Sequence, residues 1–320
     1  MASSASLSYM LLGALVADAA SLGVHWIYEP ERLADIAERR EGSAAFVPVD
    51  AQNYANTKGY FAHADRQDGM MTQYGEALYL AMRVMLQNGG AFDVAAYQSA
   101  FSAHFGPGGR YSGYIDRPTR AALENIGQEI LTPSGTDDDQ LPAVSRLPAI
   151  MARYLEAPDL QARAKAAMEV TNVNDVASDY TDVFIDLFKR LAANAPLADA
   201  LDAVARAAPE PLREGLLEAL STQESSSTEY AGVTGRACHL PMAGPLIFHI
   251  LKHATSYRDA VERNLLAGGD NAGRAPLIGA VMGLLHGLDG PHGVPLEWVL
   301  SVHQSDKIWE ACHGLGHARS

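Results

Sequence analysis

Near the C-terminal end of the chain, a short polar segment precedes a long apolar one in the stretch LLAGGDNAGRAPLIGAVMGLLHG, residues 265–287. Gly268 and Gly269 permit backbone conformations that a Cβ atom disfavours, so the Asp270 carboxylate can accept the free amide protons of the helix that follows. Arg274 lies four residues further on, within reach of Asp270 on a helix. The pattern predicts a helix N-cap, and charged groups at the mouth of a buried helix are also typical of a functional site.

Arg274 has two interpretations. Its guanidinium can neutralise a buried carboxylate or bind an anionic part of a ligand through two parallel hydrogen bonds. Alternatively, Arg274 and Asp270 form an ordinary ion pair on the helix surface, which would contribute little to stability. Asn271 stands between them and adds an amide group that can bind a substrate.

Aromatic and acidic residues meet again in the sequence HWIYE, after the first predicted helix. His25, Trp26 and Tyr28 are suited to stacking against a base or lining a cleft, although aromatic side chains are more often part of a hydrophobic core. Glu29 follows them directly. We therefore treat His25 as a candidate substrate-binding residue and Glu29 as a candidate catalytic base.

Two further segments place polar groups at predicted helix starts. The segment TQYGEAL at residues 72–78 carries Thr72, Tyr74 and Glu76, which can bind substrate if they face the same cleft as Asp270. The glycine-rich loop YSGYIDRPTR can shape a substrate pocket, or it can be a simple turn before a helix. Its candidate residues are Tyr111, Tyr114 and Asp116.

The elements that must position these residues are helices. Apolar residues recur at helical spacing, and long alternating strand patterns are missing, so we predict an all-α fold. We expect residues 1–320 to form a single compact domain, an orthogonal helical bundle. Small residues such as Gly13, Gly279 and Gly283 allow close approach and place the first and last long helices at its centre. The predicted helices cover residues 8–28, 73–88, 92–104, 118–131, 146–156, 158–171, 176–193, 197–207, 210–221, 243–253, 256–267 and 272–288.

Polar residues gather in the longer segments between these helices. Long loops inside a compact domain usually serve a function. If they converge on the ends of the two central helices, they form one polar cleft. The four segments are residues 42–72, 105–117, 132–145 and 222–242.

Composition excludes several classes of protein. The 320-residue chain is 48% hydrophobic and carries a formal net charge of −14, which argues against binding to a nucleic-acid backbone. Cys238 and Cys312 are the only cysteines, so we expect no disulfide framework and a reducing, cytoplasmic setting. The N-terminus lacks the basic start of a signal peptide, and we expect no membrane-spanning segment.

One histidine pair resembles a metal-binding spacing. His249 and His253 lie four residues apart, which can place two imidazoles on one face of a helix. No glutamate accompanies them in the zinc-protease pattern. We therefore expect both side chains at the helix surface.

Several segments together resemble the ADP-ribosylglycohydrolase family, which includes the dinitrogenase-reductase activating glycohydrolase and the jellyfish J1 crystallins. They occur in the family's order over most of the chain, and the last is the most specific. The resemblance implies an all-α, single-domain fold and hydrolysis of an N- or O-glycosidic bond to ADP-ribose, assisted by two Mg²⁺ ions in a central cleft. The segments are GALVADAASLGVHWIYE, GMMTQYGEAL, SGYIDRPTRAAL, SRLPAI and the block from Cys238 to Gly287.

The chemistry of ribosyl transfer explains why such a family uses clustered carboxylates. Cleavage builds positive charge on the sugar and needs a water molecule at the anomeric carbon. Mg²⁺ ions held by oxygen ligands can orient both the ribose hydroxyls and this water, and a carboxylate can deprotonate it.

The carry-over of the family's metal ligands is partial. Glu29 matches the family's glutamate after the first helix. Thr72 matches the first residue of the family's Thr-Asp-Asp-Thr run, and Asp270 matches the first acid of its Asp-Thr-Asp-Thr run. The resemblance therefore assigns Asp270 and Glu29 as catalytic residues and metal ligands, with an incomplete Mg²⁺ site and no dinuclear centre. The residues that depart from the pattern are Gln73, Tyr74, Asn271, Ala272 and Gly273.

Three functions follow from these patterns. The first is a hydrolase for ADP-ribose or a related ribosyl conjugate, which acts on a small molecule or an ADP-ribosylated substrate with Asp270 or Glu29 as base. The second is a non-catalytic ligand-binding or crystallin-like scaffold that has lost the metals. The third is an N-glycosidase for another small sugar conjugate. The retained acids favour an enzyme, and the lost ligands favour a scaffold.

Overall fold

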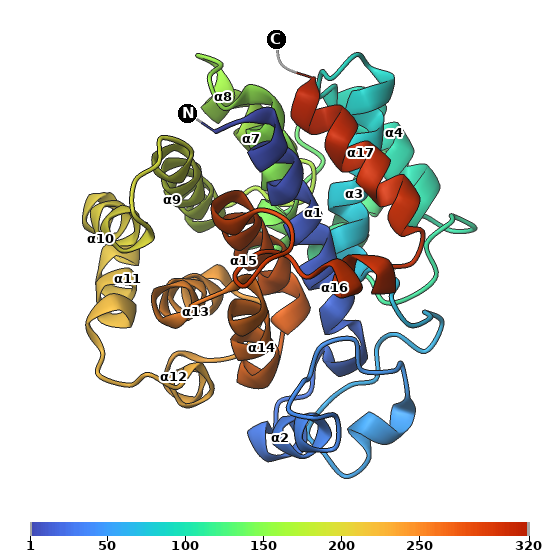
Figure 1. The fold of residues 1–320 in the computed structure, drawn as a ribbon. Helices are drawn as coiled ribbons and strands as arrows, with labels where there is room; N and C mark the ends of the chain where they lie inside the picture. Colours follow the sequence, from blue (N-terminus) through green and yellow to red (C-terminus); the bar gives the residue numbers. More distant parts are fainter. Residues whose placement is uncertain (1, 319–320) are drawn as a thin grey trace.

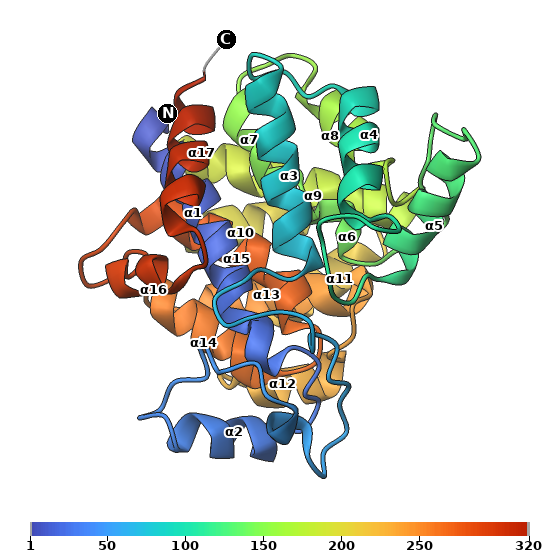
Figure 2. The same cartoon turned by 90° about the vertical axis from the view of Figure 1, so that its right-hand side faces the viewer.

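The computed structural model describes residues 2–318, and most of them are helical. Within this range no β-sheet forms, and extended residues pair only in isolated bridges. Helices cross one another in several directions, with α2 (Pro30–Glu38) lying crosswise to α3 (Gln73–Gln87) (Figure 2). The prediction of an all-α fold is confirmed.

The remaining helices complete the bundle, and the chain starts and ends on the same side of the molecule. The start of α1 and the end of α17 lie at the end opposite α2 (Figure 1). Their bounds are α1 (Ser4–Ser21), α4 (Val94–Phe105), α5 (Arg117–Gly127), α6 (Pro142–Ser145), α7 (Leu147–Tyr154), α8 (Leu160–Met168), α9 (Asp175–Ala192), α10 (Leu197–Ala207), α11 (Leu212–Ser221), α12 (Ser227–Thr234), α13 (Leu240–His253), α14 (Tyr257–Ala267), α15 (Asn271–His286), α16 (Leu296–Ser301) and α17 (Ser305–His317), with 3₁₀ turns at Leu22–Val24 and Ala51–Tyr54.

Helices α1 and α15 form the centre of the bundle, as predicted. They pack at backbone contact, because a Cβ atom on Gly279 would overlap the carbonyl oxygen of Gly13. A Cβ atom on Gly283 would likewise overlap the carbonyl oxygen of Tyr9. Small residues therefore bring these two axes close enough to align the N-terminus of α15 with the segment that follows α1.

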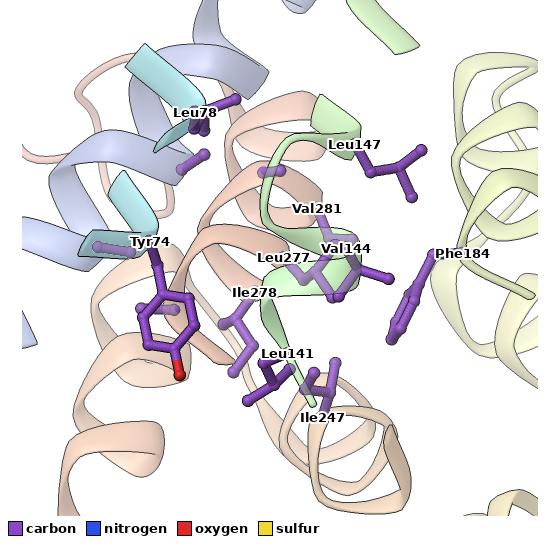
Figure 3. Close-up of a cluster of buried hydrophobic side chains, with 14 of the residues drawn as sticks. Tyr74, Leu78, Leu141, Val144, Leu147, Phe184, Ile247, Leu277, Ile278 and Val281 are labelled. Atoms are coloured by element: carbon purple, nitrogen blue, oxygen red, sulfur yellow. The ribbon is translucent and has the colours of Figure 1, made fainter. Parts of the chain in front are cut away.

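The apolar core surrounds this helix pair. Ile278 and Val281 of α15 belong to the same buried cluster as Leu78 of α3 and Phe184 of α9. Figure 3 shows these side chains together with Tyr74, whose ring lies in the cluster while its hydroxyl is the one polar atom of that side chain. Tyr74 thus connects the apolar core to the polar site described below.

Helix α1 is apolar enough to resemble a membrane span. Within the helical segment Ser4–Val24, an 18-residue window has a mean hydropathy of 1.6, but 94% of that window is buried inside the fold. A core helix that contacts protein on all sides needs the same composition.

The structure corrects several helix boundaries. The first helix ends at Ser21, with a 3₁₀ turn to Val24, rather than continuing to residue 28, because Trp26 and Ile27 form backbone hydrogen bonds with Gly269 instead. Helix α12 lies inside a segment predicted to be a loop, and α2, α6, α16 and α17 were not predicted. These helices are short or polar, and tertiary packing rather than intrinsic propensity stabilises such helices.

Candidate functional site

Asp270 lies at the centre of a buried polar cluster. It caps α15 through Oδ1, which accepts the Gly273 amide proton at 3.0 Å, and the same oxygen lies 2.8 Å from His25 Nε2. Oδ2 accepts the Tyr74 hydroxyl at 2.8 Å. Burial raises the pKa of Asp270, but the hydrogen bonds from His25 and Tyr74 and the charge of Arg274 outweigh burial and hold the pKa below its usual value. The predicted N-cap is confirmed, and Asp270 is an ionised group in the core.

A chain of two imidazoles extends from Asp270. His25 Nδ1 lies 2.7 Å from His63 Nε2, and both rings are buried. When His25 is neutral and its Nε2–H donates to the ionised Asp270, its Nδ1 is an acceptor and His63 donates from Nε2. His63 Nδ1 is then an imidazole nitrogen without a proton. This atom is buried and has no hydrogen-bond partner within residues 2–318.

The environment keeps His63 neutral. Burial lowers its pKa well below the usual value, and the charge of the neighbouring Arg66 lowers it further. His63 is held by the irregular segment between the 3₁₀ turn at Ala51–Tyr54 and α3. The Asp270–His25–His63 chain therefore ends in a bare, neutral base.

Asp116 is a second buried carboxylate in this region. It caps α5 with Oδ1, which accepts the Thr119 amide proton at 2.8 Å, whereas Oδ2 is buried without a partner among the described residues. Burial raises the pKa of Asp116 to about 6, and the negative charge of Asp270 contributes. One region thus contains a carboxylate whose pKa is lowered and another whose pKa is raised to about 6.

Aromatic rings cover this cluster. The Trp26 ring lies 4.5 Å from that of Tyr114 and 5.9 Å from that of Tyr60, and Tyr60 is 60% exposed. Trp26 has a positive φ of 71°. A bulky residue rarely adopts this conformation, which usually persists only where the surrounding structure or a function requires it. The Trp26 N–H donates to the Gly269 carbonyl at 2.9 Å, so the glycine pair fixes this geometry.

Arg274 stabilises the glycine loop. It is fully buried, with Nε donating to Asn264 Oδ1 at 2.9 Å and Nη2 to the Gly268 carbonyl at 2.7 Å. Burial lowers its pKa to about 10, so it stays charged at neutral pH. The surface-pair interpretation is wrong because Arg274 is not exposed. Within residues 2–318 it forms no hydrogen bond to a carboxylate, and its charge acts on Asp270 at longer range.

Thr72 joins α3 to α1 through another buried acid. Its Oγ1 donates to Asp18 Oδ2 at 2.6 Å, and its backbone N–H donates to Asp18 Oδ1 at 2.7 Å. The Gly75 amide adds a third hydrogen bond at 3.0 Å. Burial raises the pKa of Asp18 to about 7, although these three donors oppose the shift.

Glu29 is not joined to this network. It occupies the N-cap position of α2 and is partly exposed, but its side chain makes no cap hydrogen bond. No hydrogen bond or ion pair within the described chain connects it to Asp270, and its assignment as a base stays a prediction. Asn271 follows Asp270 in the chain, and its Nδ2 donates to the Val24 carbonyl at 3.3 Å, while its Oδ1 has no partner among the described residues.

Glu76 and Tyr111 lie in a neighbouring cluster rather than in the Asp270 network. Arg66 Nη2 donates to Glu76 Oε1 at 2.5 Å, and its guanidinium lies 4.7 Å from the centre of the Tyr111 ring. His104 Nε2 contacts the other Glu76 oxygen at 3.1 Å. The predicted substrate-binding residues therefore fall into two groups.

The donor set does not fit two Mg²⁺ ions. The oxygens of Asp270 and Asp18 already accept hydrogen bonds from protein groups. Gln73, where the family resemblance calls for an acid, is a neutral amide that is 2% exposed and whose side chain has no hydrogen-bond partner in the part of the chain that the structure describes. Residues 2–318 contain no group of three or more His, Cys, Asp or Glu side chains arranged to hold a metal. Mg²⁺ is held in proteins by one or two carboxylates and keeps waters in the rest of its octahedral shell, and here the carboxylates of Asp270 and Asp18 are engaged by protein donors instead.

The sequence matches the family profile described as ADP-ribosylglycohydrolase over residues 7–320. The chain belongs to the ADP-ribosylglycohydrolase family. Crystallin J1A of Tripedalia cystophora is 24% identical over 314 residues, with 93% of this chain and 92% of the crystallin aligned. Crystallin J1B of the same organism is 23% identical, with 94% and 92% aligned.

A solved structure shares the fold. A chain titled ADP-ribosylglycohydrolase-related protein complex superposes with a TM-score of 0.71 at 17% identity and covers 98% of each chain. The ADP-ribosylglycohydrolase architecture is therefore retained from end to end. The departures of this chain from the family pattern lie in side chains at the site and not in the scaffold.

Sequence reasoning missed His63 and Asp18 as members of the site. His63 lies 38 positions from His25 in the sequence, so the spacing of the two residues did not predict that they meet. The sequence does show a histidine in a polar loop at this position. The prediction that His249 lies at the helix surface is also wrong. This side chain is fully buried and forms hydrogen bonds with Ser227 and with the Glu224 carbonyl.

Proposed function

We propose that this protein hydrolyses a glycosidic bond of a ribosyl conjugate with side chains in place of the metals that the family resemblance implies. One observation carries the proposal. Two buried polar atoms without a partner among residues 2–318, His63 Nδ1 and Asp116 Oδ2, belong to groups whose pKa values are shifted in opposite directions, that of His63 downward and that of Asp116 upward. An unpartnered buried polar atom costs about 1 to 3 kcal/mol, and such atoms are typical of sites that a ligand completes.

The two groups can divide the reaction between them. His63 Nδ1 takes a proton from water as the water oxygen attacks the anomeric carbon. Asp116 gives its proton to the leaving atom as the glycosidic bond breaks and the electron pair moves to that atom. Proton exchange with solvent then restores both groups. Asp270 and His25 act as positioning residues, because they fix the His63 tautomer and stabilise the charge that it acquires.

Family membership supports the reaction class, and the site geometry supports the choice of residues. Trp26, Tyr60 and Tyr114 supply the aromatic surface on which a base or another planar leaving group can stack. Small ribosyl conjugates and ADP-ribosylated side chains are the substrates that we propose.

Kinetics on N-linked and O-linked ADP-ribose conjugates test the proposal. We expect Asp116→Asn to reduce kcat/KM by about 10²- to 10⁴-fold, because the amide retains the helix cap but cannot supply the proton. Asp93→Asn is the matched control, since Asp93 caps α4 at an exposed position. We expect the same loss for His63→Gln. Activity of Asp116→Asn equal to that of wild type would overturn the assignment.

A non-catalytic scaffold is the second candidate. The two crystallins at 23–24% identity and the saturated hydrogen bonds of Asp270 favour it. In that case neither hydrolysis nor binding of any ribosyl conjugate will be measurable with the wild-type protein.

A further inference from the structure

A cavity lies between α3, the end of α4 and the start of α17. Its volume is about 270 Å³, and no residue of the Asp270–His25–His63 chain lines it. Five of its lining side chains are basic or can become so. They are Arg66, Arg83, His104, Arg110 and His303.

Most of the charged side chains that line this cavity are positive, although Asp306 in the first turn of α17 lies close enough to act on the lining residue Tyr79. Glu76 is the one acidic residue in its lining, and Arg66 and His104 already bind both of its oxygens. Arg83 and Arg110 form no ion pair within residues 2–318, and Arg83 only lies near the Tyr79 ring at 5.9 Å. A concentration of free guanidinium groups is unusual in a protein with a net charge of −14.

The cavity also receives a helix N-terminus. Gln304, the N-cap residue of α17, lines the cavity together with Ile308 in the first turns of this helix. Gln304 has a left-handed φ of 57° and makes no cap hydrogen bond. The first amide groups of a helix carry partial positive charge and point toward a bound anion.

We infer that this cavity binds a phosphate dianion, as a phosphomonoester of a small molecule or as inorganic phosphate. Planar guanidinium groups and helix amides match the geometry of phosphate oxygens. Arg66 Nε and Nη2 already donate to the Met71 carbonyl, at 3.1 and 2.6 Å, and Nη2 to Glu76, so these bonds fix the position of its charge while Arg83 and Arg110 supply the donors. The inference goes beyond the proposed hydrolysis and does not rest on it.

Calorimetric titration of the full chain tests the inference with inorganic phosphate, glycerol 3-phosphate and glycerol. We expect saturable binding of both phosphates and none of glycerol. The double variant Arg83→Gln/Arg110→Gln should weaken phosphate binding about tenfold or more, because two charge-assisted contacts are lost. Binding of inorganic phosphate alone would identify the ligand as the free ion, and binding of both would identify a phosphomonoester site.

A matched double variant controls for the change in net charge. Arg163→Gln/Arg206→Gln removes two arginines from exposed ion pairs on α8 and α10, and it should bind phosphate within twofold of wild type. Asp116→Asn should also retain binding, which separates this site from the proposed hydrolase site. Absence of saturable phosphate binding by wild type, or equal binding by the Arg83→Gln/Arg110→Gln variant, would overturn the inference.

Discussion

At the scale of single residues, the site is defined by carboxylates with different environments. Asp270 is ionised because His25, Tyr74 and the Gly273 amide donate to it. Asp116 has a raised pKa because it is buried with one oxygen unsatisfied. When two similar groups lie in different environments, their pKa values move apart. Proteins use this difference to obtain an acid and a base from similar groups.

The raised pKa of Asp116 predicts a cost in stability. The folded protein binds more protons than the unfolded chain between about pH 4 and 6, so stability falls as pH rises through this window. Asp116→Asn removes that cost and should be more stable than wild type at pH 8 by about 2 to 3 kcal/mol. Urea unfolding at pH 4 and pH 8 measures the difference. A variant with the same pH dependence as wild type would show that Asp116 is not perturbed.

The same groups predict the pH dependence of activity. Asp116 must be protonated to act as acid, so kcat/KM should decline as pH rises above about 6. His63 must be neutral to act as base, and because its pKa is lowered, activity should persist well below pH 6.5. A pH–rate profile checks this expectation. An optimum above pH 8 would contradict the assigned roles.

At the scale of elements, the contact between α1 and α15 positions the site. Gly279→Ala should destabilise the fold by about 2 to 4 kcal/mol, because its Cβ atom meets the Gly13 backbone and the Ala17 side chain. Gly127→Ala at the end of α5 is the control, since no atom lies within 4 Å of the added Cβ. Thermal unfolding compares the two variants. Equal melting temperatures would mean that the helix axes can separate at little cost.

At the scale of the whole molecule, the ADP-ribosylglycohydrolase scaffold is retained while the metal donor set is changed. Because the donors of residues 2–318 do not fit Mg²⁺, dialysis against EDTA should change kcat/KM and melting temperature by less than the error of measurement. Inductively coupled plasma spectrometry of the purified protein provides the complementary measurement. Loss of activity with EDTA that Mg²⁺ restores would contradict this prediction.

The amino-acid sequence by itself determined the fold class, most helix positions, the Asp270 cap and the central helix pair. These features depend on local periodicity, on capping residues and on small side chains at regular spacing, all of which are visible along the chain. Tyr74 and His25 were singled out because each adjoins a recognisable helix boundary, and both contact Asp270, while their role in substrate binding stays a prediction.

Only the tertiary structure decided which polar groups meet and in what proton state. His63 reaches His25 from a segment without regular structure, and Arg274 is buried against backbone carbonyls although its spacing also suited a surface pair. Hydrogen-bond partners and burial set a pKa, and both depend on residues that are distant in sequence. The separation of Glu76 and Tyr111 from Asp270 arises in the same way, from how helices pack rather than from where their residues occur in the chain.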